Sequence, residues 1–322
     1  MNKQYLLRLI LGWLMVFMGS SCLMMQVDLK PKEELQEQFV SGDNSSSNKV
    51  LLMSISGVIL ADEVDNQRSD AATPGHIKEM LEKAGKDKQV KALILEIDSP
   101  GGGVTASDMI YTYLKDFRKD HNIPIIALMK DVAASGAYYI SMASDYIIAH
   151  PTSVTGSIGV ISIFVTIPDL LRWLKVEVVV VKSGDAKDAG SPFRKMTKEE
   201  KAKFQEIIDE MYAGFVDIVA GNRKSLSRDE IKSLADGRIF TGRKALEAKL
   251  VDAIGYDTSA INKAKELAQL KDAKVVRYKK PQGVLESALR LQNNQTEIDR
   301  LSQAFCETLT NKFMYLWLPG AE

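Results

Sequence analysis

The sequence predicts an α/β protein with a mainly parallel sheet and crossover helices. Apolar strand segments alternate with helical segments along most of the chain, and this alternation is typical of parallel sheets joined by crossover helices. Residues 90–97 (VKALILEI) form an almost continuous apolar run, as expected of a strand covered on both faces. Two glycine-rich turns follow predicted strands, so we expect them to face each other across a crevice of the sheet.

The composition excludes several classes of function. The 322 residues are 45% hydrophobic, which allows a substantial core, and Lys+Arg and Asp+Glu are equal at 42 each. A nucleic-acid-binding protein normally has a basic bias, so no nucleic-acid partner is expected. The chain has two cysteines and three histidines, too few for a disulfide framework or a metal cluster. We therefore expect no metal cluster. No ATP-binding loop is apparent either, and we expect the protein to need no metal and no cofactor.

Residues 1–27 are predicted to be a signal or anchor segment. Lys3 and Arg8 precede an uncharged, apolar run from residue 9 to residue 27, and the positive charges indicate that the rest of the chain lies on the extracytoplasmic side of a membrane. Gly19-Ser20-Ser21-Cys22 leaves a second interpretation open, a lipoprotein cleavage site with a lipid on Cys22. We expect a protein held at the bacterial cytoplasmic membrane in either case.

Residues 28–48 are polar and are predicted to be a linker, and residues 49–280 are predicted to be the main domain. Capping boxes at Thr197/Glu200 and Ser227/Glu230 indicate two helix starts. The expected strands are 50–59, 90–97, 124–129, 146–149, 160–167, 176–182, 238–240, 251–254 and 275–278. The expected helices are 76–84, 106–120, 136–143, a long one from 197, 242–249 and 257–267.

Residues 281–322 are predicted to be a C-terminal helical tail. Between residues 285 and 317, apolar side chains recur on one face of a helix. Two interpretations stay open for this face: it packs on its own body or a sister subunit, or it belongs to a regulatory tail that enters a neighbour's active site.

The strongest candidate for chemistry is Ser135, in the run of small residues AASGAYY (133–139). We expect Ser135 where a strand turns into a helix, whose first backbone amides are unpaired donors. A hydroxyl in this position can attack a carbonyl while nearby amides hold the oxyanion. Gly136 supplies one such amide, and the glycine turn that contains Gly102 can supply the other because glycine lets the backbone approach closely.

A serine nucleophile also needs a base. His150 is one candidate, at the end of a short strand, and Lys187 is another, in a loop rich in glycine and alanine. A lysine acts as a base only when it is neutral, so its pKa must fall from about 10.4 to about 7–8. Lys182 is the alternative lysine, and Asp188 beside Lys187 opposes the shift unless it points away.

Four motifs in order resemble the bacterial signal peptide peptidase A family in its short, single-repeat form. They are DSPGGG (98–103), AASGAYY (133–139), TGSIGV (155–160) and KSGDAKDAGSPFRKMTKEE (182–200). The resemblance implies a crotonase/Clp-protease-like fold and a Ser/Lys dyad. Ser135 matches the nucleophile, Lys187 the general base, Ser157 a supporting hydroxyl, and Gly102 and Gly136 the oxyanion hole. Ala137 departs from the pattern, which often has a second glycine there.

The resemblance also implies a ring or dome of identical subunits, with eight as one candidate number, in which each dyad is completed within or between protomers. The expected function is that of a membrane-bound serine endopeptidase degrading apolar peptides such as remnant signal peptides. Two alternatives remain: a crotonase-like acyl-CoA enzyme, which requires neither Ser135 nor Lys187, and a non-catalytic membrane scaffold of the same fold.

Overall fold

The computed structural model describes residues 34–61, 72–280 and 313–317. The described residues from Leu35 onward belong to one compact unit. Its strands are β1 (Gln36–Gly42), β2 (Lys49–Ser56), β3 (Val90–Ser99), β4 (Gly101–Gly103), β5 (Ile125–Ala134), β6 (Tyr146–Ala149), β7 (Val154–Gly156), β8 (Ile239–Thr241), β9 (Ala253–Ile254), β10 (Lys274–Lys279) and β11 (Met314–Leu316). Its α-helices are α2 (Pro74–Lys86), α3 (Val104–His121), α4 (Gly136–Ser141), α5 (Pro168–Trp173), α6 (Lys198–Asn222), α7 (Arg228–Leu234), α8 (Gly242–Glu247) and α9 (Asp257–Leu267), and a 3₁₀ turn, η2, spans Asp185–Asp188.

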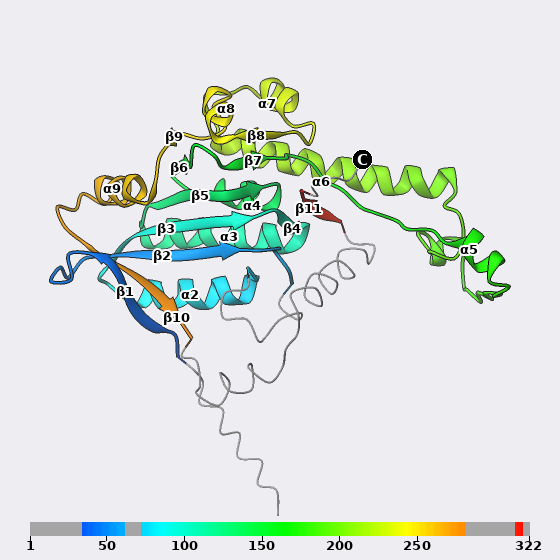
Figure 1. Ribbon diagram of the computed structural model, residues 1–322, viewed down its shortest axis with the longest axis horizontal. Coiled ribbons are helices and arrows are strands. Elements are labelled where there is room, and N and C mark those ends of the chain that lie inside the picture. Colours follow the sequence, from blue (N-terminus) through cyan, green and yellow to red (C-terminus); the bar gives the residue numbers. More distant parts are fainter. Residues whose placement is uncertain (1–33, 62–71, 281–312, 318–322) are drawn as a thin grey trace, which may run out of the picture. The chain divides into compact units, whose positions relative to one another are not determined.

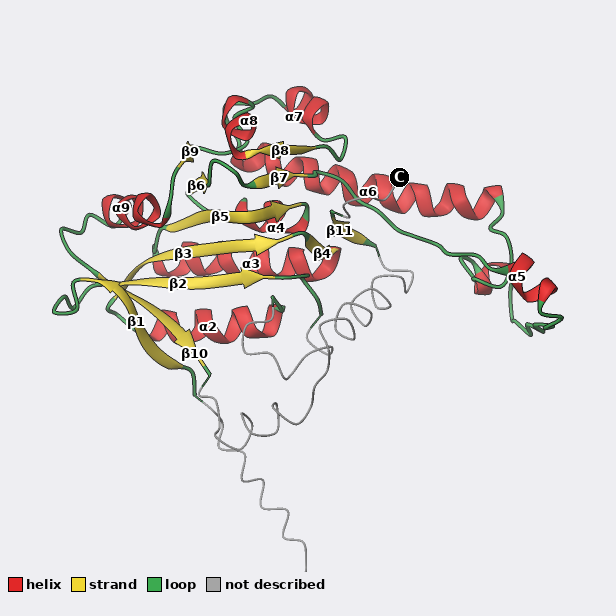
Figure 2. Cartoon of the chain, viewed as in Figure 1, coloured by secondary structure: helices red, strands yellow, loops and turns green. Residues whose placement is uncertain are grey.

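The main sheet runs in the order β1-β10-β2-β3-β5-β6-β9, and β7 pairs with β5 and with β8. The neighbours from β10 to β9 are parallel, whereas β1 and β8 join as antiparallel strands at two edges. Figure 2 shows α2, α3 and α4 against the strands, and α9 packs on β3, β5 and β2. The predicted mixed α/β class with a mostly parallel sheet is confirmed.

Both faces of the central strands are buried because helices cover each of them. On β2, Leu51 and Met53 belong to the larger core cluster with α2, α3 and α6, while Val50 and Leu52 join the smaller cluster with α9. Successive side chains of a strand point to opposite faces. The continuous apolar run 90–97 in β3 follows from this double coverage, as the sequence predicts.

Three expected segments differ from the sequence prediction. Residues 36–42 of the expected linker form the edge strand β1, which pairs antiparallel with β10. The expected strand 176–182 is absent, and residues 160–167 contain a single bridge, at Ile161. The helix expected to reach residue 317 is a strand at Met314–Leu316, because β4 supplies backbone partners. Residues 281–312 of the predicted tail and residues 1–27 of the predicted anchor lie outside the described residues.

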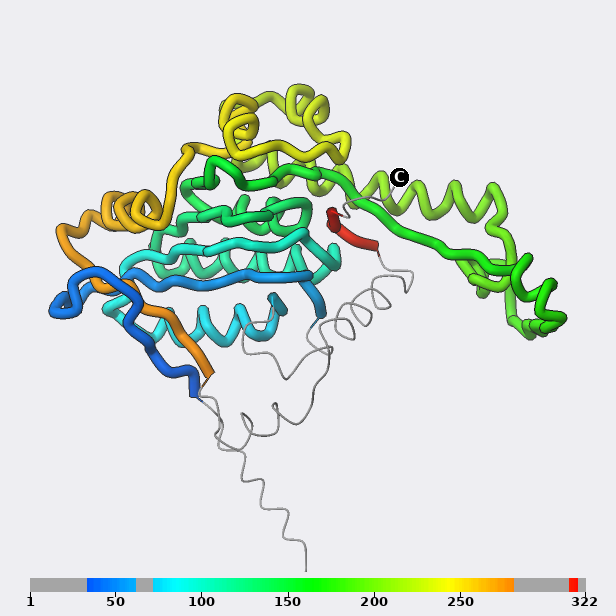
Figure 3. Tube along the Cα trace, in the orientation of Figure 1, coloured from blue at the N-terminus to red at the C-terminus, as the bar shows by residue number. Residues whose placement is uncertain are grey.

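A projecting arm, residues 162–197, carries α5 and η2 away from the sheet. Figures 1 and 3 trace it at the right, where the chain runs out from β7 and returns through α6. None of the α5 residues is buried. Within the described ranges, no helix is long and apolar enough to cross a membrane.

Candidate active site

Ser135 lies in a sharp turn between β5 and α4. Its backbone angles are φ 54° and ψ −115°, a conformation that side chains with a Cβ rarely adopt. Its N–H donates to the Gly156 carbonyl at 2.8 Å, and its carbonyl accepts from the Tyr139 N–H at 2.9 Å. A strained strand-to-helix turn of this kind presents a nucleophilic serine at the end of a sheet. The predicted position of Ser135 between strand and helix is what the structure shows.

The glycine turn 101–103 meets Gly136 directly. Gly101 has φ +97°, and a Cβ placed on it would lie 2.7 Å from the backbone nitrogen of Gly136. Only a residue without a side chain lets the two loops approach this closely. The first amide of α4, that of Gly136, therefore stands beside the Gly101 backbone, and the turn that contains Gly102 lies close to Ser135 and Gly136, as the sequence predicts.

The short strand β11 lies across this junction as an extended peptide. It pairs antiparallel with β4, with Tyr315 opposite Gly102. The Trp317 N–H donates to the Pro100 carbonyl at 2.9 Å, and the Val104 N–H donates to the Phe313 carbonyl at 3.4 Å. In an antiparallel ladder, hydrogen-bonded pairs alternate with pairs that are not hydrogen-bonded. Pro100/Trp317 and Val104/Phe313 are two hydrogen-bonded pairs, so Gly102/Tyr315, midway between them, is the next one.

On its other side, β11 contacts the loop after β7. Ile161 and Met314 exchange both backbone hydrogen bonds at 2.9 Å. The Tyr315 carbonyl oxygen would overlap a Cβ on Gly101 and would lie 3.1 Å from a Cβ on Gly136. The Tyr315 carbonyl therefore lies against the backbones of Gly101 and Gly136, next to the residue that follows Ser135.

An aromatic pocket holds the Tyr315 side chain. The Tyr315 ring stacks on Tyr139 with centroids 5.2 Å apart and contacts Phe215 at 4.7 Å. Its hydroxyl donates to the Met211 carbonyl at 3.1 Å, and burial raises the pKa of Tyr315 to about 12. The sequence analysis gave Phe215, Met211 and Tyr139 no role in the site. The only sequence feature that could have indicated this pocket is the tyrosine pair that follows AASGA.

Lys187 does not meet Ser135 within one chain. It is exposed on η2, and Arg194 joins that turn to the start of α6 by ion pairs to Asp188 and Glu200. Phe215, whose ring lies 5.1 Å from that of Tyr139, marks the active-site end of α6. Glu200 and Phe215 are fifteen positions apart, and a helix rises about 1.5 Å per residue, so about 22 Å of helix separates these two ends.

The carboxylate of Asp188 forms ion pairs with Arg194 and Lys182. Arg194 and Lys182 both bind it, the latter at 2.7 Å, and these partners lower the pKa of the Asp188 carboxyl. The two cations that bind the Asp188 carboxylate are therefore Arg194 and Lys182. Lys182, the alternative base, is itself engaged in this pair.

Ser157 lies close to Ser135 in the structure. It follows Gly156, which pairs with Ala134 and accepts from the Ser135 N–H. Ser157 is nearly buried, has φ 50°, and its N–H donates to the Arg238 carbonyl at 2.8 Å. His150, by contrast, is bonded through Nδ1 to Thr152 and stacks edge-on against Tyr256.

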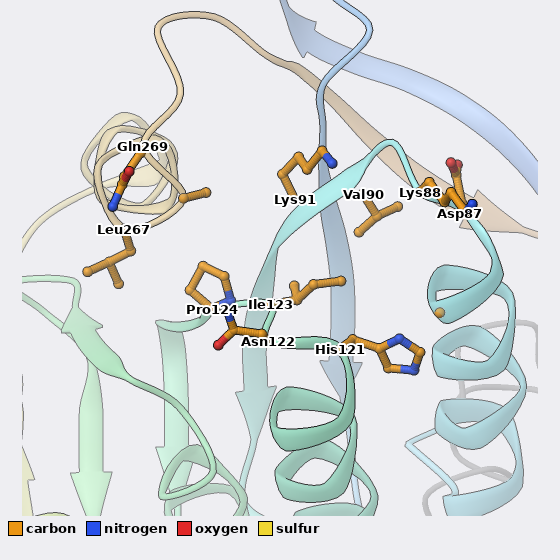
Figure 4. Close-up of a pocket in the computed structure, with 12 residues that line it drawn as sticks. Asp87, Lys88, Val90, Lys91, His121, Asn122, Ile123, Pro124, Leu267 and Gln269 are labelled. Atoms are coloured by element: carbon orange, nitrogen blue, oxygen red, sulfur yellow. The ribbon is translucent and has the colours of Figure 1, made fainter.

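A cavity of about 620 Å³ lies at the opposite end of the strands. Figure 4 shows it between the starts of β3 and β5, with Lys91, Asn122 and Gln269 around it. Ser135 follows the far end of β5, a ten-residue strand that spans about 33 Å. This cavity is therefore separate from the glycine loops. Within the described ranges, no group of three or more His, Cys, Asp or Glu side chains is placed to hold a metal ion.

The chain matches known peptidases. The family model described as peptidase family S49 matches residues 117–271. A putative signal peptide peptidase SppA of Enterococcus faecium is 39% identical over 239 residues, 74% of this chain and 69% of that protein. A putative protease of Methanocaldococcus jannaschii is 36% identical over 70% of this chain and 74% of that protein. Protease 4 of Haemophilus influenzae is 34% identical over 68% of this chain and 35% of that protein.

A solved structure of a membrane-bound stomatin-specific protease covers 68% of this chain and 86% of that chain, with 15% identity and a TM-score of 0.42; no conclusion rests on this distant likeness. The first two sequence relatives are 39% and 36% identical, and the match covers 69% and 74% of their length, whereas it covers 35% of protease 4. Together with the family match, they support a serine peptidase, and they show that this chain belongs to peptidase family S49, with relatives named signal peptide peptidase SppA and protease 4.

Proposed function

We propose that this protein is a serine endopeptidase that cleaves extended peptides with Ser135 as the nucleophile. The observation that carries the proposal is β11, a peptide strand bound between Gly101–Gly103 and Ile161, with its Tyr315 carbonyl against the backbone of Gly136, the residue after Ser135. Peptides recognised as an added β-strand gain affinity from their backbone and selectivity from pockets for alternate side chains.

The proposed first step is attack of Ser135 Oγ on the substrate carbonyl. The Gly102 and Gly136 amides hold the oxyanion that forms. This part of the proposal is supported by the Tyr315 carbonyl of β11, which lies against the backbones of Gly101 and Gly136. A neutral lysine takes the hydroxyl proton and passes it to the leaving amine, which breaks the peptide bond. Water, activated by the same lysine, then releases the acyl group. Ser157 supports the position of the lysine.

We propose that Lys187 of a second copy of this chain supplies the base. Within one chain, Lys187 lies at the far end of α6 from Ser135, and the arm that carries it exposes an unusual number of large apolar side chains. These include Trp173, 78% exposed, and Val181, 95% exposed. Exposed apolar surface of this extent marks an interaction site. A ring of copies, each arm packed on the next body, would bury it and complete every dyad.

The finer parts of the assignment belong to the same proposal. We propose a crotonase/Clp-like fold, in keeping with the parallel sheet and the small second sheet of β4 and β11. We also propose attachment to a membrane through residues 1–27 or a lipid on Cys22, with remnant signal peptides as substrates. The aromatic pocket that holds Tyr315 would accept an apolar side chain of such a substrate.

The test is subunit complementation with the full chain. Ser135→Ala and Lys187→Ala variants are each assayed on unfolded peptides, alone and after co-assembly, with Lys182→Ala as the matched lysine control. We expect each dyad variant to be inactive alone. Random mixing in a ring places an intact Ser135 next to an intact Lys187 at about one quarter of the sites, so the mixture should regain activity of that order.

A mixture that stays inactive while the parent is active would show that the dyad is completed within one chain. An active Lys187→Ala variant would remove Lys187 from the mechanism. If the parent cleaves no peptide, the endopeptidase proposal itself fails and the non-catalytic scaffold gains support.

A further inference from the structure

Two buried serines stand at the two ends of the glycine loop. Ser99 ends β3 and Ser107 lies in the first turn of α3, and both are fully buried. Ser99 Oγ accepts a hydrogen bond from the Gly101 N–H at 3.1 Å. Ser107 Oγ donates to the Gly103 carbonyl at 2.9 Å. Each end of the turn that contains Gly102 is therefore tied to a neighbouring element by a hydroxyl.

Ser107 also contacts the second half of the oxyanion hole. A Cβ on Gly136 would overlap Ser107 Oγ, so this oxygen packs directly on the Gly136 backbone. The same hydroxyl thus touches the glycine loop through Gly103 and the start of α4 through Gly136. Ser107 lies between the two backbone segments whose amides must keep a fixed separation.

The glycine loop needs such ties because its own sequence supplies little rigidity. Three consecutive glycines have wide backbone freedom, and Gly101 adopts a positive φ. Donors stabilise a developing oxyanion only when they are held in place before the charge forms. An untied loop would have to be ordered during the reaction, at a cost in rate.

We propose that Ser107, together with Ser99, positions the Gly102 and Gly136 amides for oxyanion binding. The inference rests on the proposed peptidase function and goes beyond it, since neither hydroxyl touches the substrate or the reacting atoms. These serines are positioning residues. Their hydroxyls fix the position of the backbone, and the backbone amides stabilise the oxyanion.

The kinetic test compares Ser107→Ala and Ser99→Ala with Ser141→Ala in the full chain. Ser141 is a matched control because it is also fully buried and its Oγ donates to the Tyr138 carbonyl at 2.6 Å. We expect kcat to fall about 10-fold or more in the two loop variants, with KM changed less than about twofold. A peptide aldehyde, whose adduct with Ser135 places an oxyanion in the hole, should bind weaker by a similar factor.

The second test does not depend on activity. Hydrogen exchange in the full chain is followed by mass spectrometry on the fragment covering residues 99–107. We expect exchange there to be several-fold faster in Ser107→Ala and Ser99→Ala than in the parent, and unchanged in Ser141→Ala.

Equal losses of kcat in Ser107→Ala and Ser141→Ala, or unchanged exchange across residues 99–107, would overturn the inference. If the parent itself lacks peptidase activity, the proposed function fails, and the exchange result alone then decides whether the serines hold the loop.

Discussion

At the scale of single residues, the site depends on a strained serine. Ser135 has a positive φ that a residue with a Cβ adopts at a cost of about 1–3 kcal/mol. Two hydrogen bonds hold it there: its N–H donates to Gly156, and its carbonyl accepts from Tyr139. The strain is tolerated because the strand before Ser135 and the helix after it are both buried in the core.

This strain predicts that Ser135→Gly is more stable than Ser135→Ala. Both substitutions remove the hydroxyl, and we expect both to abolish turnover, but only glycine relieves the backbone. The expected gain over Ser135→Ala is about 1 kcal/mol, or about 2–4 °C in melting temperature for a domain of this size. Thermal unfolding at one protein concentration measures it. A glycine variant that melts at or below the alanine variant would show that the turn is unstrained.

At the scale of elements, β11 fills the groove between β4 and Ile161, where we propose that substrate binds. The strand is three residues long, and it is held by β4 on one side and Ile161 on the other. The ring of Tyr315 supplies the apolar contact in the aromatic pocket. A segment bound at the place of the substrate reduces the apparent affinity for substrate by the fraction of sites it occupies.

We therefore expect Tyr315→Ala to activate the enzyme toward added peptides. The substitution removes the ring contacts and the bond to Met211, so β11 should leave the groove more often. The apparent KM should fall at least about threefold, with kcat little changed. Tyr256→Ala, at an exposed tyrosine outside the groove, is the control. An unchanged KM in Tyr315→Ala would indicate that β11 does not compete with substrate.

At the scale of the whole molecule, the projecting arm, residues 162–197, leaves many apolar side chains uncovered in a single chain. Its valine run, residues 176–181, is largely exposed and pairs with no strand among the described residues. An extended apolar segment without a partner favours association. In the proposed assembly, the same contact that covers the valines carries Lys187 to the next Ser135.

The assembly predicts that Val181→Asp dissociates the protein and abolishes peptide hydrolysis together. A charge at this position would have to be buried in the interface, which costs several kcal/mol. Sedimentation velocity should show the parent as an oligomer and the variant as a single folded chain. Phe39→Asp, at an exposed position on the edge strand β1, should leave the assembly intact. A parent that sediments as a single chain would refute the ring.

Much of this molecule follows from local pattern. The apolar runs predict the central strands, and small residues around Ser135 predict a strand-to-helix turn, because side-chain periodicity and glycine geometry are local properties. The prediction is wrong for the valine run 176–181, which has strand composition but no neighbouring strand to pair with. It is also wrong for β1, whose mostly exposed side chains give no apolar signal.

The sequence by itself determined the fold class, the family and the turn that carries Ser135, since these depend on residue types in a short span. Only the tertiary structure decided that Met314–Leu316 forms a strand, because backbone partners from β4 and Ile161 outweigh the helical periodicity. It also decided that the turn carrying Lys187 is tied to the first turn of α6, whereas the Ser135 turn lies near Phe215, fifteen positions after Glu200. A motif records which residues are present, whereas the distance between them is set by how the elements pack.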